Sequence, residues 1–355
     1  MRLRSILLDV GRNVLTGTTR SVLLTSVLGA VCLVLLGADL LAVRSIENAA
    51  TAFREAGGST MTIVASGRVD GARCEALGQI SGVRAAGALA LPQEKVTAAS
   101  LPGAPLPAGY ATDGFLSVVH ADVDRGGGVV LSEDAARTLG RVRADVLETT
   151  VGPTRVAGTF PYPVDGRRSG LGYLALLPGG DRAVFDECWV EAWPQDERLR
   201  TLLFTTLLPP ADESTDDPVV GQLNASLGAA FDGHARFADR ITRFGGVAAG
   251  VFALLLGIVA VRARRVELAA ALHDRVRAAD LWSMSLLEAT AWVVPPLAVC
   301  MATSMLVLGA RGDLLLAAVL GARVAIPAGL GALLGTMFGL ALTRERHLFL
   351  YAKDR

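Results

Sequence analysis

Four long apolar runs constrain the fold of this 355-residue chain more than any other feature. They cover residues 21–43, 244–261, 281–309 and 314–342. A helix rises about 1.5 Å per residue, so runs of this length cross a hydrocarbon layer of about 30 Å. Charged residues make up 19% of the chain, which is too many for a protein made only of spans. We therefore predict four transmembrane helices and a separate polar region.

The first apolar run could also be read as a cleaved signal peptide. It is longer than the apolar core of such peptides, and no small-x-small cleavage site stands clearly behind it. We favour a retained membrane anchor. Its one charge, Asp39, lies near the outer end, where we expect the side chain to reach the membrane interface.

Charge is distributed unevenly along the chain, although the net charge is zero. Residues 44–243 hold 19 basic and 25 acidic side chains, whereas the short segments 1–20, 262–280 and 343–355 are basic. Four spans place these three short segments on one side, and the positive-inside rule makes that side cytoplasmic. We predict a multi-pass protein of the bacterial cell (plasma) membrane with both termini in the cytoplasm, an amphipathic elbow at 1–20, and residues 44–243 outside the cell.

The 200-residue block 44–243 is predicted to be an α+β domain. A helical extension at 44–56 ends at Gly57, and Ser132 caps a helix that Gly140 ends. Further helices are expected at 71–80 and 219–243. Strands are expected at 60–65, 83–91, 94–99, 129–131, 146–151, 154–160, 172–177, 188–193 and 202–207, with hairpins among 146–177.

The four cysteines fall into two classes. Cys32 and Cys300 lie in apolar runs and are expected to be buried small hydrophobes. Cys74 and Cys188 lie in the polar block, where an oxidising compartment favours a disulfide between them. Two free thiols, or pairing with another chain, are the alternatives.

Enzyme signatures are missing from the sequence. It contains no GxxxxGK[ST], HExxH or GxSxG motif, and its four histidines are not at metal-ligand spacing. We expect no catalytic residue, no metal and no means of hydrolysing ATP in this chain.

Two further charges lie inside predicted spans. Glu288 lies about two turns into the third run, and Arg323 about three turns into the fourth. Charges at this depth are costly, so we expect these two to pair or to line a polar route, with a structural role favoured over conduction.

The segment between the second and third runs, residues 262–280, is strongly basic. Its charges are Arg262, Arg264, Arg265, Arg275 and Arg277 against Glu267, Asp274 and Asp280. Its apolar residues recur at helical spacing, at Leu268, Leu272, Val276 and Ala279. We predict a basic amphipathic helix that contacts a partner in the cytoplasm.

Several local stretches resemble the FtsX-like/MacB-like permeases of ABC transporters, the type VII or mechanotransmission family. The entry at 7–30 resembles the family's elbow and first span. The stretch GVVLSEDAARTLG at 128–140, followed by TRVAGTFPYP at 154–163, resembles an outer-domain segment. RRVELAAAL at 264–272 and LLEA at 286–289 resemble the coupling segment and the next span.

This resemblance implies a permease subunit with a MacB-like outer domain and no motor of its own. A separate ABC ATPase, carrying ATP and Mg, would dock under residues 262–280. The implied coupling residues are Arg264, Arg265, Glu267, Leu268, Leu272 and Arg275. The resemblance also implies a second permease copy or paralogue, membrane lipid, an extracytoplasmic protein partner and no nucleic acid. The chain lacks the glycine that usually follows Glu-Leu-Ala in the family, which leaves the docking geometry open.

Two other functions fit the same topology. The chain could be a membrane-anchored sensor or regulator whose outer domain binds a ligand without ATP-driven transport. A membrane-bound enzyme that uses the outer block is the third hypothesis, and the missing motifs speak against it.

Overall fold

Four helices in a computed structural model of the chain are long and apolar enough to cross a membrane. They are α2 (Ser21–Glu55), Ile241–Arg262 containing α8 (Gly245–Arg262), α10 (Ala278–Gly309) and α11 (Leu314–Ala341). The structure describes residues 11–13, 16, 20–124, 126–140, 145–180, 182–209, 217–274, 276–310 and 312–343. Some predicted segments therefore lie outside the described residues, namely most of the elbow, Arg275, residues 210–216 of the polar block, and all of the tail except Thr343. The four predicted spans are confirmed as helices.

The chain divides into two units, each with its own core. The first comprises Met1–Glu47 and Gly233–Arg355, and the second comprises Asn48–Asp232. The boundaries fall inside α2 and just before α7 (Gly233–Asp239). One helix, α2, therefore belongs to both units.

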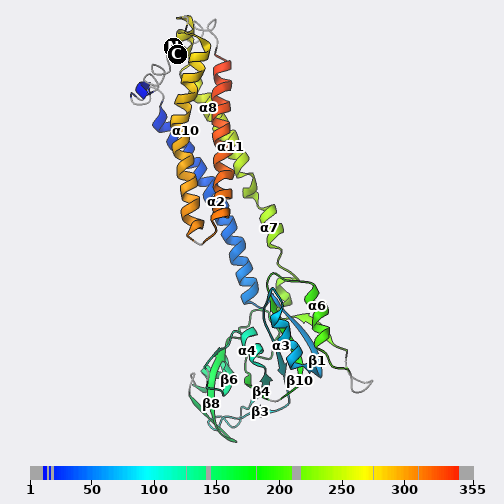
Figure 1. The fold of residues 1–355 in the computed structure, drawn as a ribbon. Helices are drawn as coiled ribbons and strands as arrows, with labels where there is room; N and C mark the ends of the chain where they lie inside the picture. The colour runs from blue at the N-terminus through cyan, green and yellow to red at the C-terminus, as the bar shows by residue number, and fades with distance from the viewer. Residues whose placement is uncertain are drawn as a thin grey trace. The chain divides into compact units, whose positions relative to one another are not determined.

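The first unit consists of α8, α10, α11 and the first part of α2, with the short helix α9 (Arg265–His273) between two of them (Figure 1). Its core is built from leucines of α2, alanines of α8 and α11, and Trp292 of α10. The Thr25 hydroxyl donates to the Trp292 carbonyl at 3.1 Å, which joins α2 to α10. The two cysteines Cys32 and Cys300 are buried in this core.

Glycines let α8 and α11 pack with their backbones almost in contact. A Cβ atom at Gly331 would lie 2.1 Å from the Gly250 carbonyl oxygen, and one at Gly335 would lie 2.0 Å from that of Leu254. Small residues at such crossings are typical of membrane helix pairs, because lipid supplies no hydrophobic drive for association. The glycines therefore determine this contact.

The second unit is built on one sheet in the order β11-β1-β10-β2-β4-β9-β6-β8-β5, with β3 beside β4 and β7 beside β8. Most pairs are antiparallel, but β4–β9 and β6–β8 are parallel. The strands are β1 (Thr60–Asp70), β2 (Val83–Ala90), β3 (Lys95–Val96), β4 (Leu106–Ala111), β5 (Asp122–Val123), β6 (Val129–Ser132), β7 (Val146–Thr149), β8 (Gly152–Phe160), β9 (Ala175–Pro178), β10 (Val184–Ala192) and β11 (Val219–Gln222). The α-helices are α3 (Gly71–Ala76), α4 (Asp113–Val118), α5 (Glu133–Leu139) and α6 (Arg198–Leu203). The predicted α+β class is confirmed.

Local sequence signals explain several of these elements. The Ser132 hydroxyl accepts from the Ala135 amide at 3.3 Å, which caps α5. Gly140 ends α5 with φ of 62°, a conformation that glycine adopts without strain. The hairpin of β7 and β8 forms as predicted.

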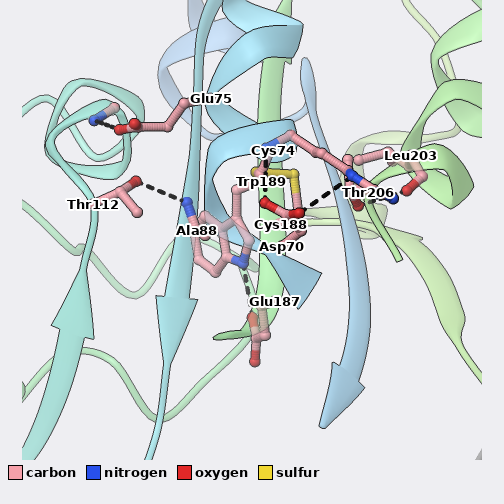
Figure 2. The surroundings of a disulfide bond; sticks show 12 residues. Asp70, Cys74, Glu75, Ala88, Thr112, Glu187, Cys188, Trp189, Leu203 and Thr206 are labelled. Atoms are coloured by element: carbon pink, nitrogen blue, oxygen red, sulfur yellow. Dashed lines mark hydrogen bonds and ion pairs between the residues drawn. A yellow bond between two sulfur atoms is a disulfide. The ribbon is translucent and has the colours of Figure 1, made fainter. Parts of the chain in front are cut away.

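A disulfide links α3 to the central strand β10. Cys74 and Cys188 are joined, with both side chains fully buried (Figure 2). The opposite face of β10 carries Trp189, whose indole donates to Glu187 at 2.7 Å. The disulfide closes a loop of 114 residues, so it restricts much of the second unit.

Three sequence-based expectations are wrong. Residues 202–207 form the end of α6 and a 3-10 turn at Phe204–Thr206 instead of a strand. Residues 219–243 form β11, a 3-10 turn and α7 instead of one helix. The strand within 172–177, β9, pairs with β4 and β6 instead of forming a hairpin with β8. The helix α4 was not foreseen at all.

Candidate functional site

The short helix α9 connects two spanning helices, α8 and α10, and carries most of the residues that the sequence indicates as functional. It begins at Arg265, three residues after α8 ends, and its last residue is His273. The predicted stripe that continued to Val276 and Ala279 is therefore too long, because a new helix, α10, begins at Ala278. The sequence predicted the helix but not its short length.

The apolar side of α9 packs on the ends of the spans. Leu268 is 7% exposed and clusters with Val261 of α8, Leu281 of α10 and Leu340 of α11. Leu272 packs against the same cluster and is partly buried. These leucines, which the sequence placed among the coupling residues, therefore hold α9 in position within its own chain.

A buried carboxylate fixes the entry to α9. Arg264, the residue before the helix, donates from Nη1 to Glu288 Oε2 of α10 at 2.5 Å. The other oxygen of Glu288 accepts from the Asn13 amide at 2.7 Å. The Glu288 side chain is 7% exposed. The Glu288 carboxylate thus joins α10 to the residue that precedes α9 and to Asn13 near the start of the chain.

Arg264 also binds an acid on α9 itself. Its Nε lies 2.9 Å from Glu267 Oε2. Burial lowers the pKa of Arg264, but Glu288 and Glu267 outweigh this effect and raise the pKa above its ordinary value. The guanidinium stays charged and bridges α9 to α10. Beside the pair lies a cavity of about 30 Å³, lined by Ser285, Thr336 and apolar side chains, which is room for about one water.

The outward side of α9 remains open for contact. The Glu267 side chain is 53% exposed, and Arg262 and Arg277 are exposed beside the helix. Arg265 is partly buried and already has an interaction within the chain. Arg275, also predicted as a coupling residue, lies outside the described residues.

Glu288 and Arg323 are not paired with one another, contrary to one expectation. Glu288 lies in the part of α10 next to α9, whereas Arg323 of α11 donates to the Arg243 carbonyl at 2.7 Å, just before α8 begins. The two charges are therefore held at opposite ends of α8 by different partners. A shared polar route between them has no support in this arrangement.

Asp39 has a buried partner that the sequence did not indicate. Its side chain is 3% exposed, and Oδ1 accepts from Arg240 Nε at 2.9 Å. Asp39 therefore forms a buried ion pair within the first unit. The sequence offered no partner for it, because Arg240 is 201 residues away.

The described residues contain no group of three or more His, Cys, Asp or Glu that could hold a metal ion. The site around Arg264 consists of an ion-pair network, a leucine cluster and an exposed acidic-basic surface. Such an arrangement positions a helix.

The fold and this site define a multi-pass membrane protein with an α+β unit between its first and second spanning helices. No protein-family model and no curated protein matches the sequence.

Two solved structures are similar to parts of the chain. The periplasmic region of MacB from Actinobacillus actinomycetemcomitans is 12% identical with a TM-score of 0.35, and the match covers 48% of this chain and 91% of that one. A domain of a protein described as a permease from Porphyromonas gingivalis is 17% identical with a TM-score of 0.31, and the match covers 42% of this chain and 83% of that one.

Proposed function

We propose that this chain is the permease subunit of an ABC-type transporter of the FtsX-like/MacB-like family. A separate ATPase would bind at α9, and its movement would reach the spanning helices. The observation that carries the proposal is the Arg264–Glu288 ion pair, because it fastens the entry of α9, whose outward side is exposed, to the interior of α10.

The geometry of α9 supports force transfer at this point. A partner would bind the exposed side of α9 near Glu267. On its other side, Leu268 packs α9 against α8, α10 and α11. The ion pair resists sliding, because separating it would take the closest cation away from the buried Glu288 carboxylate and leave it with only the Asn13 amide. Movement of α9 would therefore carry α10 with it.

The proposed topology follows the charge pattern. The basic segments, including α9, would face the cytoplasm, and the second unit would lie outside the cell. A disulfide between Cys74 and Cys188 suits an oxidising compartment, which supports this orientation.

The proposed assembly contains two permease chains, identical or paralogous, with the ATPase and its ATP and Mg beneath them. Hydrolysis would drive movements of the second unit, through α2, that export a substrate, extract lipid or lipoprotein, or activate an outer partner protein. This chain itself would bind no cofactor and carry out no catalysis.

Affinity purification of the full chain from native membranes tests the proposal. We expect a protein with a nucleotide-binding motif to co-purify, and we expect Glu267→Lys to reduce its recovery, because this reverses the charge of an exposed side chain on α9. Arg265→Glu is a second variant at the same helix. Tyr173→Lys in the second unit is a matched exposed control that should leave recovery unchanged. Recovery without any ATPase would favour the sensor or regulator instead.

A further inference from the structure

A cavity of about 400 Å³ lies in the second unit and is lined by residues of α4, β5, β6, β8 and β9. Protein interiors leave few voids larger than a water molecule, so a hollow of this size is more than a gap in packing. Its volume falls within the range of about 300–1,000 Å³ that is typical of small-molecule pockets. The proposed contact between α9 and an ATPase makes no use of it.

The floor of this cavity is apolar and buried. Ala111 of β4, Val130 of β6, Ala157 of β8 and Leu176 of β9 are each at most 4% exposed. All four belong to one core cluster of the second unit. An apolar group that enters the cavity therefore leaves water for a surface that is continuous with the core, and this transfer is favourable.

The rim of the cavity is exposed, so a ligand can reach the floor. Val123 of β5 is 38% exposed, and Asp113, Gly127 and Pro178 are exposed as well. Gly127 has φ of 66°, and a Cβ atom at this position would meet no other atom within 4 Å. Gly127 therefore contributes no side chain that could cover the cavity.

Two carboxylates line the cavity, and one of them has no partner. Asp124 Oδ2 lies 2.6 Å from Arg155 Nη2, and Asp124 Oδ1 accepts from the Gly126 amide at 2.9 Å. The Asp113 carboxylate forms no hydrogen bond or ion pair with the described residues. The described residues that line the cavity include no Lys, Arg or His. This lining favours a cation and disfavours an anion.

We propose that this cavity binds a small apolar molecule that carries a protonated amine. The apolar body lies on the buried floor, and the ammonium group donates to the Asp113 carboxylate at the rim. This site goes beyond the proposed contact with an ATPase and does not depend on it, because all the residues that line the cavity belong to the second unit.

Binding of three matched probes to the purified full chain tests the proposal. The probes 4-phenylbutylamine, 4-phenylbutanol and 4-phenylbutyrate share one apolar body and are positive, neutral and negative. The chain is titrated calorimetrically in phosphatidylcholine nanodiscs, and titrations of empty nanodiscs are subtracted because the probes also enter lipid. We expect the amine to bind up to about fivefold more tightly than the alcohol, the effect of an ion pair with an exposed acid, and the carboxylate to bind most weakly.

Removing the charge of Asp113 tests the polar part of the site. Asp113→Asn keeps the shape of the side chain, so it should reduce the affinity for the amine to that for the alcohol and leave the affinity for the alcohol unchanged. Asp217→Asn, at another exposed acid of the second unit, is the control and should keep the preference for the amine.

Filling the cavity tests its apolar part. Leu116→Trp enlarges a partly buried side chain of the lining and should abolish binding of the amine and of the alcohol. Val123→Trp, at the exposed rim, carries this test if Leu116→Trp does not fold. Val146→Trp, at a valine of β7 that is 44% exposed and does not line the cavity, is the control and should bind both probes as the wild type does.

Four results would overturn the proposal. They are no saturable binding of the amine, binding of the alcohol or the carboxylate as tight as that of the amine, a preference for the amine that persists in Asp113→Asn, and unchanged binding in the folded tryptophan variants of the lining. None of these measurements involves an ATPase, so a failure here leaves the proposed function standing.

Discussion

Arg264 Nη1 and Glu288 Oε2 lie 2.5 Å apart, so the residue that precedes α9 is bound to the interior of α10. The two residues are 24 positions apart, and the whole of α9 lies between them. The ion pair therefore holds the start of α9 against α10. This contact explains how a short helix of nine residues keeps a definite position at the ends of the spans.

Removing Glu288 should destabilise the protein far more than removing Glu267. Glu288→Gln leaves the Arg264 charge in a partly buried place without its closest acid, and we expect a loss of about 3 kcal/mol in the free energy of unfolding. Glu267 is half-exposed, so Glu267→Gln should cost no more than about 1 kcal/mol. Denaturant unfolding of the full chain in detergent measures both, and similar losses would contradict the role given to Glu288.

The disulfide should stabilise the second unit. Replacing Cys74 and Cys188 together by alanine removes a link that closes a long loop, and we expect a loss of about 2–5 kcal/mol. Reductant should lower the unfolding temperature of the wild type and have no effect on the double variant. A wild type that is insensitive to reductant under unfolding conditions would argue that the two thiols are free.

Glycine spacing makes a sharp prediction for α8 and α11. Gly331→Ala should destabilise the first unit, because the new Cβ would lie 2.1 Å from a carbonyl oxygen of Gly250. Gly37→Ala, on α2 with nothing within 4 Å, should be neutral or stabilise by up to about 1 kcal/mol, since glycine is a poor helix former. Thermal unfolding of the two variants in detergent compares them. If Gly331→Ala is as stable as Gly37→Ala, the helices do not pack as closely as the structure has them.

Acid should weaken the second unit through Asp165. Its hydrogen bonds to Arg167 lower the pKa of the carboxyl below the ordinary value. A lowered pKa in the folded state means that the stabilisation is complete above the unfolded pKa of about 3.9 and is lost as the pH falls through the folded pKa. Unfolding midpoints of the wild type and Asp165→Asn should therefore converge below about pH 4. Midpoints that stay equally far apart down to about pH 2 would contradict this.

Sequence alone predicted the elements whose signals are local. The four apolar runs, the Ser132 cap and the Gly140 stop each depend on residues within a few positions, and all are confirmed. The strand predicted at 202–207 failed because Leu199 and Leu203, four residues apart, are both buried on one face of α6. Leu199 precedes residues 202–207, so this stretch alone does not contain the helical spacing.

The site was less predictable than the fold, because its contacts join distant residues. The sequence pointed to Arg264 and Glu288 as separate signals, and only the packing of α9 on the spans brings them together. Asn13 and Arg240 carried no signal of their own. Arg236 and Arg243 flank Arg240 in the sequence, and nothing in the sequence distinguishes Arg240 from them as the partner of Asp39.

Photo-crosslinking from position 267 is the most direct test of the proposed contact between α9 and an ATPase. A benzophenone amino acid replaces Glu267, which is 53% exposed on α9, in cells that make the native partners. The same amino acid in place of Tyr173, equally exposed in the second unit, is the control. We predict a crosslink from position 267, and none from position 173, to a protein with a nucleotide-binding motif. Crosslinks from position 267 to lipid alone, or to no such protein, would contradict the account.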